Sequence, residues 1–150
     1  MIMMIKPSVQ KGMKNVKILI DTNVILDVLC NRPDFVEDSS KVWKYCETKQ
    51  INGFISALSI PNIVYILRKE LTPEKTQQLI EQIMIIFNVI DLKSSDLKNA
   101  SEMLTSDFED AVQMCCAERI KADFIITRNI RDINNSKIPA LKPSELLERL

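Results

Sequence analysis

Carboxylates that follow or begin apolar segments are the side chains of this sequence best suited to chemistry. Asp21 directly follows the apolar run of residues 16–20, and Asp107 and Asp110 are three residues apart, which in a helix places them on one face. Carboxylates brought close together repel one another, and a divalent cation relieves that repulsion. Oxygen ligands favour Mg²⁺ or Mn²⁺, which can generate hydroxide from bound water and stabilise charge on a phosphorus atom under attack.

The same aspartates also have a purely structural explanation. Asp21 precedes an expected helix, where Asp is a favoured N-cap, and the spacing of Asp107 and Asp110 is that of a capping arrangement. Acids in a first helical turn are also stabilised by the helix dipole, by roughly 0.3–1 kcal/mol. Convergence of all three carboxylates on one rim of the fold would favour the metal site over capping.

The composition excludes most other catalytic machinery. The chain has no histidine, which removes histidine-based acid–base relays, Ser-His-Asp triads and His-ligated zinc. Its only two glycines, Gly12 and Gly53, leave no glycine-rich phosphate loop. Because 20 Lys and Arg residues balance 20 Asp and Glu residues, any polyanion must be held locally.

The chain reads as one domain of a cytoplasmic protein. Residues 1–15 are expected to be a loose leader and residues 16–150 the domain, because the apolar run at the start is too short for a signal peptide. No window reaches the roughly 18 apolar residues that a membrane span needs. The four cysteines lack C-x-x-C spacing and indicate a reducing compartment: Cys30, Cys46, Cys115 and Cys116.

Apolar strands are expected to alternate with amphipathic helices. The expected strands are residues 16–20, 53–56, 88–92, 123–129 and a short one at 140–141. The expected helices are residues 23–29, 36–49, one that Ser59 caps, 73–87, 94–104, 107–121 and 143–150. This alternation predicts a Rossmann-like, three-layer α/β/α sandwich around a mostly parallel sheet. Ligands of such sheets bind beyond the carboxyl ends of the strands, where Asp21 and Asn129 are expected.

Five segments of the sequence resemble a known family. KILIDTNVILDVL with Arg32 and Pro33, FISALSIPNIVYILRK, DFEDAVQ, ADFIITRNIRDI and IPALKPSELL occur in the order and spacing of PIN domains. PIN domains form the nuclease fold of toxins in VapBC-type toxin–antitoxin modules. The resemblance implies an α/β/α sandwich, Mg²⁺- or Mn²⁺-dependent cleavage of RNA, an antitoxin partner and a homodimer.

The resemblance also assigns site residues, with two departures from the family pattern. The key acids fall on Asp21 and Asp110, with Asp107 as a supporting carboxylate, whereas Asn62 and Asn129 stand where acids are usual. An amide oxygen can bind a metal or orient water but brings no charge. The expected catalytic residues are Asp21, Asp110, Asp107 and Asn62, and the expected metal ligands are Asp21, Asp110 and Asn129.

Other polar residues near these segments are candidates with weaker support. Asp132 and Asp27 could restore part of the missing charge, although Asp27 is better explained as a residue on a solvated helix face. Guanidinium groups suit phosphate oxygens, and Thr127 could line the site or simply fill its place in a strand. The expected substrate-binding residues are Thr127, Arg128, Arg131 and Arg32, with Arg68 as a further candidate.

The expected helix of residues 73–87 carries more apolar residues than one packed face requires. Leu79, Ile80, Ile83, Met84 and Phe87 are expected to face inward. A contact with a second subunit or an antitoxin is the alternative to burial within the monomer. Trp43 and Tyr45 lie among helical apolar positions and are expected in the core, not on a base-stacking surface.

Three hypotheses of function follow from the sequence. The first is a metal-dependent ribonuclease, the toxin of a type II toxin–antitoxin module. The second is a PIN fold with weak or no catalysis that binds RNA or protein, because Asn62 and Asn129 replace expected acids. The third is a phospho-acceptor domain, which is disfavoured because Asp21 has no acidic neighbour and begins D-T-N, not D-x-D.

Overall fold

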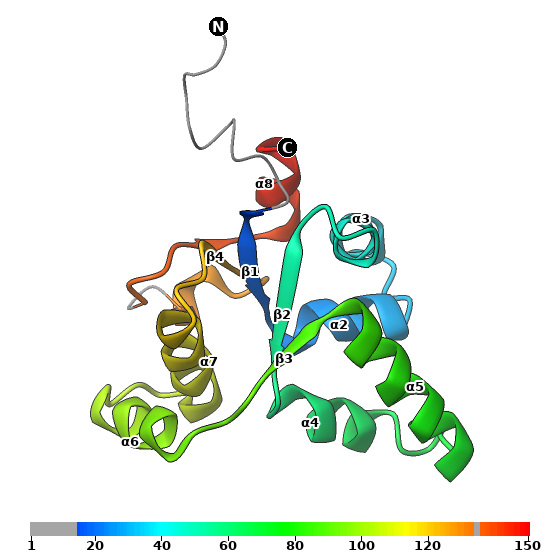
Figure 1. Ribbon diagram of the computed structural model, residues 1–150, viewed down its shortest axis with the longest axis horizontal. Helices are drawn as coiled ribbons and strands as arrows, with labels where there is room; N and C mark the ends of the chain where they lie inside the picture. The colour runs from blue at the N-terminus through cyan, green and yellow to red at the C-terminus, as the bar shows by residue number, and fades with distance from the viewer. Residues whose placement is uncertain (1–14, 134–135) are drawn as a thin grey trace, which may run out of the picture.

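A central sheet of five parallel strands organises the chain. The computed structural model describes residues 15–133 and 136–150, and the leader expected at residues 1–15 lies outside them apart from Asn15. The strand order is β3-β2-β1-β4-β5 (Figure 1). The strands are β1 (Lys17–Ile20), β2 (Asn52–Ser56), β3 (Asn88–Ile90), β4 (Phe124–Ile126) and β5 (Ala140–Leu141). All paired strands run parallel, as the sequence predicts.

Helices cover both faces of this sheet. The α-helices are α2 (Thr22–Leu29), α3 (Val36–Glu47), α4 (Ser59–Ile66), α5 (Pro73–Ile86), α6 (Ser94–Glu102), α7 (Phe108–Arg119) and α8 (Pro143–Glu148). A 3₁₀ turn, η2 (Ile130–Ile133), follows β4. One core lies under α2, α3, α4, α5 and α8, and a second lies under α6 and α7, on the left in Figure 1. The predicted α/β/α sandwich is therefore confirmed.

Residues 18–20 of β1 and all three residues of β4 are apolar because both faces of these strands are covered. In β1, Ile18 and Ile20 pack into the first core and Leu19 into the second. In β4, Ile126 and Ile125 divide between the two cores in the same way. Each apolar run ends where the sheet ends, so the first polar residue after it stands at the rim.

Two expectations about side chains are wrong. Met84, expected from the sequence to face inward, is 58% exposed, because α5 packs through one face around the buried Ile83 and the helical period turns Met84 to solvent. Ser59 is not the N-cap of α4 but lies inside the first turn, with Leu58 at the cap position. The expectation for Trp43 is confirmed, since its ring packs edge-on against Phe87 at 5.0 Å.

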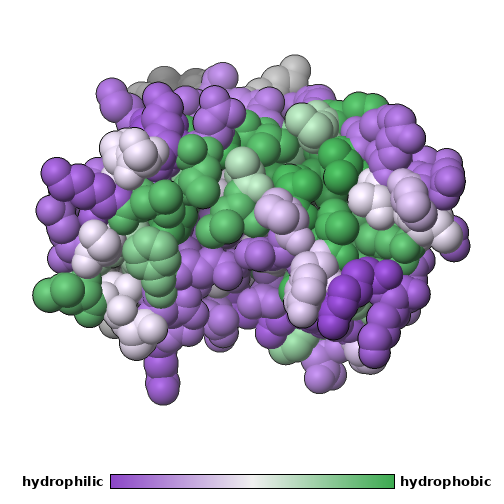
Figure 2. All heavy atoms as spheres, turned by 90° about the horizontal axis from the view of Figure 1, so that it is seen from below, coloured by the Kyte–Doolittle hydropathy of each residue, from purple (hydrophilic) through white to green (hydrophobic). Residues whose placement is uncertain are grey.

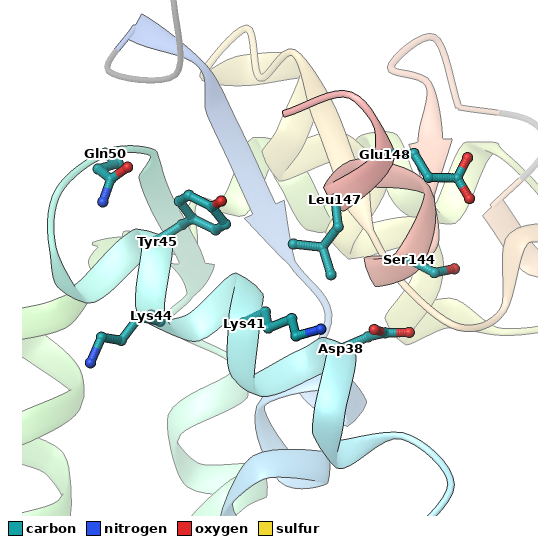
Figure 3. Close-up of a pocket in the computed structure, with 8 residues that line it drawn as sticks. All are labelled: Asp38, Lys41, Lys44, Tyr45, Gln50, Ser144, Leu147 and Glu148. Atoms are coloured by element: carbon teal, nitrogen blue, oxygen red, sulfur yellow. The ribbon is translucent and has the colours of Figure 1, made fainter.

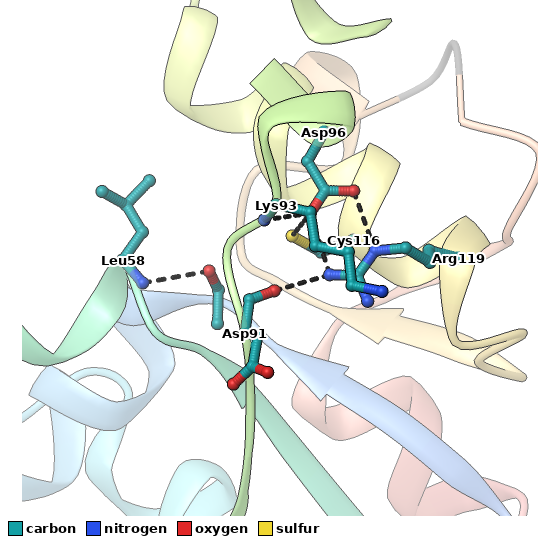
Figure 4. A network of polar contacts seen from close by, with 7 residues as sticks. Leu58, Asp91, Lys93, Asp96, Cys116 and Arg119 are labelled. Carbon is teal, nitrogen blue, oxygen red and sulfur yellow. Dashed lines mark hydrogen bonds and ion pairs between the residues drawn. The ribbon is translucent and has the colours of Figure 1, made fainter. Parts of the chain in front are cut away.

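A buried ion pair anchors the C-terminal end of α7 (Figure 4). Arg119 Nε and Nη2 donate to the two carboxylate oxygens of Asp96 at 3.0 and 2.8 Å, and Nη2 also donates to the Asp91 carbonyl at 2.6 Å. Asp96 Oδ2 accepts from the Lys93 amide at 3.0 Å, which caps α6. These bonds lower the pKa of Asp96 although its burial alone would raise it. The pair ties α7 to α6 and to the segment that follows β3.

The described chain has no element suited to a bilayer. No helix within residues 15–133 and 136–150 combines the length and the apolar character of a membrane span. All four cysteines are free thiols. Burial raises the pKa of Cys46 to about 12 and that of Cys116 to about 11, so these two thiols are core residues and not nucleophiles.

Candidate active site

Asp21 lies at the carboxyl end of β1, and its side chain does not cap the helix that follows. Its amide donates to the Ile126 carbonyl at 2.9 Å, which extends the pairing of β1 with β4. The residue occupies the N-cap position of α2 but makes no side-chain capping bond. Instead, Asp21 Oδ2 accepts a hydrogen bond of 3.1 Å from the Thr127 hydroxyl at the end of β4. The capping explanation is therefore wrong for Asp21.

The Asp21 carboxyl has a pKa closer to neutral pH than an ordinary aspartate does. It is only 6% exposed, and this burial raises its pKa from an ordinary value of 3.8 to about 6. The Thr127 hydrogen bond works in the opposite direction, and the negative charge of Glu109 raises the pKa further. A group that binds to and neutralises the ionised Asp21 would relieve the cost of burying this charge.

The first turn of α7 brings more carboxylates to the same rim. Asp107 is the N-cap of α7, and its Oδ1 accepts from the Asp110 amide at 3.1 Å, so the capping explanation is confirmed for Asp107. Partial burial raises the pKa of Asp110 to about 7, and the charges of Asp107, Asp21, Asp132 and Glu109 raise it as well. The charge of Asp21 therefore acts on Asp110, while a shared metal site of these two residues stays a prediction.

Glu109 is a member of this cluster that sequence reasoning missed. Its Oε1 accepts a hydrogen bond of 3.2 Å from the Asn62 side-chain amide on α4. Its charge raises the pKa values of both Asp21 and Asp110. Adjacent helical residues normally face different directions, which is why the spacing gave no signal. Asn62 thus carries no charge itself, but it holds the Glu109 carboxylate beside the position where the family usually has an acid.

The segment after β4 supplies the remaining polar groups. Thr127 is fully buried, and its hydroxyl also accepts from the Asn129 amide at 3.1 Å. Asn129 is exposed at the end of this segment, and Asp132 follows in η2, where its charge raises the pKa of Asp110. Thr127 thereby supports the Asp21 carboxylate from a fully buried position, while substrate binding by Thr127 and a role for Asn129 as a metal ligand stay predictions.

Asp27 is not on a solvated helix face, contrary to the expectation from its sequence position. It is fully buried, and its carboxylate accepts from Arg128 Nε at 2.9 Å, from Arg32 Nη1 at 3.3 Å and from the Ser39 hydroxyl at 3.3 Å. The amphipathic pattern of α2 did not predict this burial, because the compensating groups lie outside the helix. Arg128 and Arg32 neutralise the Asp27 charge, and the Ser39 hydroxyl adds a hydrogen bond.

The arginines expected to bind phosphate differ in how freely they could do so. Arg32 and Arg128 already use part of their guanidinium groups on Asp27, although both remain partly exposed. Arg131 is exposed on η2. Arg68 stacks on the Tyr65 ring, 3.9 Å from its centroid. Phosphate binding by these four residues stays a prediction.

A buried polar network lies beneath the rim. The hydroxyls of Thr22 and Ser59 are 2.7 Å apart, and Gln113 Nε2 donates to the Ser59 hydroxyl at 3.3 Å. These residues link α2, α4 and α7, and Gln113 lies one helical turn beyond Asp110 on the same face. Gln113 Oε1 is buried and, among the described residues, has no hydrogen-bond partner. The first residues of α2 and α4 are thus joined to each other and to the second turn of α7, beside Asp21, Asn62 and Asp110.

The donor set fits a hard divalent cation held partly through water. Within residues 15–133 and 136–150, no three acidic or thiol side chains form a ready-made metal site. Two carboxylates and water ligands are nevertheless a usual set for Mg²⁺, which gives up its waters reluctantly. The unsatisfied oxygen of Gln113 adds an acceptor one turn below Asp110. Asp21 and Asp110 are the residues that could hold such an ion.

A separate cavity of about 740 Å³ lies between α3 and α8 (Figure 3). It is lined by Asp38, Lys41, Lys44, Tyr45, Gln50, Ser144, Leu147 and Glu148. None of these is a candidate site residue, and two lysines offset two acids. The cavity is therefore separate from the cluster of Asp21, Asp107, Glu109, Asp110 and Asp132, which we call the acidic rim.

Comparison with known proteins decides the family. Residues 17–131 match the PIN domain sequence profile, which covers most of the chain and includes Asp21, Asn62, Asp110 and Asn129. The chain belongs to the PIN domain family. No curated protein sequence matches it significantly.

Solved structures share the same fold. VapBC2 from Rickettsia felis, bound to a DNA fragment from its promoter, superposes with a TM-score of 0.65 at 16% identity, over 85% of this chain and 98% of that one. A toxin–antitoxin complex from Klebsiella pneumoniae gives a TM-score of 0.65 at 17% identity, over 83% and 96%. VapC20 from Mycobacterium tuberculosis, a toxin that cleaves the sarcin–ricin loop, gives 0.59 at 12% identity, over 72% and 86%. These matches show that this PIN domain has a VapC-like fold.

Proposed function

We propose that this PIN domain is a metal-dependent endoribonuclease that uses Mg²⁺ or Mn²⁺ to cleave RNA phosphodiester bonds. The observation that carries the proposal is the acidic rim itself: Thr127 holds Asp21 at the end of β1, Asn62 holds Glu109 at the start of α7, and the charges of both acids raise the pKa of Asp110. Family membership supports the same reaction class. Because the chain has no histidine, the carboxylates of the rim are the proposed acid–base groups.

Each residue of the rim has a separate task in this proposal. Asp21 and Asp110 would hold the ion, with the Asn129 amide oxygen as a further ligand, and the bound ion would supply Lewis acidity and an activated water. Thr127 keeps one Asp21 oxygen occupied and so orients the other. Asp107 uses Oδ1 to cap α7 and keeps Oδ2 to position water. Asn62 acts indirectly, since it holds Glu109, whose charge favours a cation.

We further propose that the protein is the toxin of a type II toxin–antitoxin module in the cytoplasm. Similar folds occur in VapBC complexes with and without DNA, which supports an antitoxin partner. Figure 2, the view onto the end of the molecule where the strands end, shows hydrophobic side chains beside hydrophilic ones. The exposed apolar residues on α4 and α5 are Tyr65, Ile66, Met84 and Ile85, and they suit a protein partner. A homodimer also stays a prediction.

Incubation of purified protein with RNA tests the nuclease proposal. Cleavage is expected with Mn²⁺ or Mg²⁺, is expected to stop with EDTA, and is expected to fall more than about 100-fold in Asp21→Asn. Asp34→Asn is the matched control, because Asp34 is exposed and lies outside the rim. Intact RNA after long incubation of folded protein with either ion would contradict the proposal.

The second candidate function is an RNA- or protein-binding module without catalysis. Asn62 and Asn129 motivate it, because each replaces an acid and together they remove two charges from the rim. Saturable RNA binding that neither Mn²⁺ nor Asp21→Asn alters, with no cleavage, would favour this candidate over the nuclease.

A further inference from the structure

Asp27 is a buried carboxylate that the proposed chemistry does not use. It lies on α2 with no exposed surface, six residues beyond Asp21. Removing a carboxylate from water is costly unless opposite charge and hydrogen bonds compensate. Arg128 and Arg32 supply the charge, and the Ser39 hydroxyl occupies the same carboxylate oxygen as Arg128.

Arg128 connects this buried charge to the site. It stands between Thr127, which donates to Asp21 Oδ2, and Asn129, whose amide donates to the Thr127 hydroxyl. Its guanidinium group also lies over the Phe35 ring, 3.9 Å from the centroid. The Arg128 side chain is therefore held by α2 and by the residue that precedes α3, while the preceding residue, Thr127, holds Asp21.

We infer that Asp27 is a positioning residue of the site, which fixes residues 127–129 through Arg128 and so sets the orientation of the Asp21 carboxylate and the place of Asn129. Its consequence for metal binding rests on the proposed function, whereas the contacts themselves do not. Asp27 touches no reacting group and acts only through Arg128. Two positions of α2 thus serve one site, with Asp21 before the helix and Asp27 inside it.

The pair of Asp96 and Arg119 provides a matched control within the same molecule (Figure 4). Asp96 is also buried and also accepts from an arginine, at 3.0 and 2.8 Å. Arg119 is nine residues beyond Asp110 on α7, about 13 Å away at 1.5 Å per residue. Loss of either ion pair should destabilise the fold, but only loss of the Asp27 pair should disturb the site.

The experiment compares Asp27→Asn, Arg128→Ala, Arg128→Lys and Asp96→Asn. Thermal unfolding measures stability, two-dimensional NMR follows the amide signals of Thr127 and Asn129, and calorimetry measures Mn²⁺ affinity. Asp27→Asn and Arg128→Ala are expected to shift both amide signals and to weaken Mn²⁺ binding about 10- to 100-fold. Arg128→Lys should restore part of that affinity, because lysine can still pair with Asp27. Asp96→Asn should lower the melting temperature but change Mn²⁺ affinity less than twofold.

Two results would overturn the inference. One is unchanged amide signals and unchanged Mn²⁺ affinity in folded Asp27→Asn. The other is an equal loss of affinity in Asp96→Asn, which would mean that destabilisation alone explains the effect. If Asp27→Asn does not fold, Arg128→Ala decides, because it leaves Asp27 paired with Arg32. If the unaltered protein binds no Mn²⁺, the proposed function fails, while the amide signals still decide whether Asp27 positions the segment.

Discussion

The Thr127 hydroxyl donates a hydrogen bond of 3.1 Å to Asp21 Oδ2 and so joins the ends of β4 and β1. In the order β3-β2-β1-β4-β5 the chain builds outward from β1 to β3 and then crosses to the other side at β4. Ligands of parallel sheets bind at such a switch point, beyond the carboxyl ends of the strands. The pairing of these two side chains therefore places a buried carboxylate where this architecture offers a binding crevice.

Stability without metal should depend on pH through Asp21. Its pKa in the folded protein is about 6, above the ordinary 3.8, so the folded state holds a proton that the unfolded state releases between these values. Above pH 7, the ionised Asp21 lowers the free energy of unfolding by about 3 kcal/mol. This penalty decreases as the pH falls below 6 and vanishes below about 4. Asp21→Asn should be more stable than the unaltered protein, and this gain in the free energy of unfolding should be about 1 kcal/mol larger at pH 7.5 than at pH 5. Urea unfolding in EDTA measures this difference, and an equal gain at both pH values would contradict the prediction.

Removal of the Glu109 charge should weaken cation binding modestly. Glu109→Gln keeps an acceptor for Asn62 but removes the charge that raises the pKa values of Asp21 and Asp110. Mn²⁺ affinity should fall about threefold to tenfold, since water screens this exposed carboxylate. Glu118→Gln, in the last turn of the same helix, is the control and should bind Mn²⁺ unchanged. Calorimetric titration compares them; identical affinities would remove Glu109 from the site.

Addition of a carboxylate at the end of β4 should have the opposite effect. Asn129→Asp restores the acid that the PIN family usually has there, at the position whose carbonyl accepts from the Asp132 amide at 3.1 Å. Mn²⁺ should bind about tenfold more tightly, whereas the metal-free protein should lose stability at pH 7.5 through added repulsion. Asn99→Asp on α6 is the control for added charge alone. Equal affinities of the two variants would show that Asn129 does not face the ion.

Loss of the Ser59 hydroxyl should destabilise the fold because it bridges Thr22 and Gln113 in a buried setting. Ser59→Ala leaves both partners without that contact, which costs about 1–3 kcal/mol. Ser101→Ala, an exposed serine on α6, should change the free energy of unfolding by less than about 0.5 kcal/mol. Denaturant unfolding measures both variants, and equal small effects would mean that the network does not hold the three helices together.

The strands and the rim could be predicted because they depend on local patterns. An apolar run buried on two faces ends where the sheet ends, which is how Asp21 and Thr127 are found from the sequence alone. The start of α7 is equally readable, since Asp107 lies three residues before Asp110 and caps the helix. Convergence of these segments follows from the parallel topology that strand–helix alternation implies.

Contacts between distant elements could not be predicted from those patterns. Asp27 reads as a solvated residue until Arg128, 101 positions later, is seen to neutralise it. Glu109 gives no signal beside Asp110 until Asn62 on α4 is seen to hold it. Helical periodicity also assigns Met84 to a core that α5 does not cover. In each case the partner lies on another element, which spacing along one helix does not reveal.

Titration of the metal-free protein with Mn²⁺ tests the central claim, that Asp21 and Asp110 hold one ion together. The measurement compares the unaltered protein with Asp21→Asn, Asp110→Asn and the control Asp34→Asn at pH 7.5, where both carboxyls are mostly ionised. We predict one saturable site in the unaltered protein and in the control, and its loss in each of the other two variants. No saturable binding in the unaltered protein, or undiminished binding in either rim variant, would contradict the account.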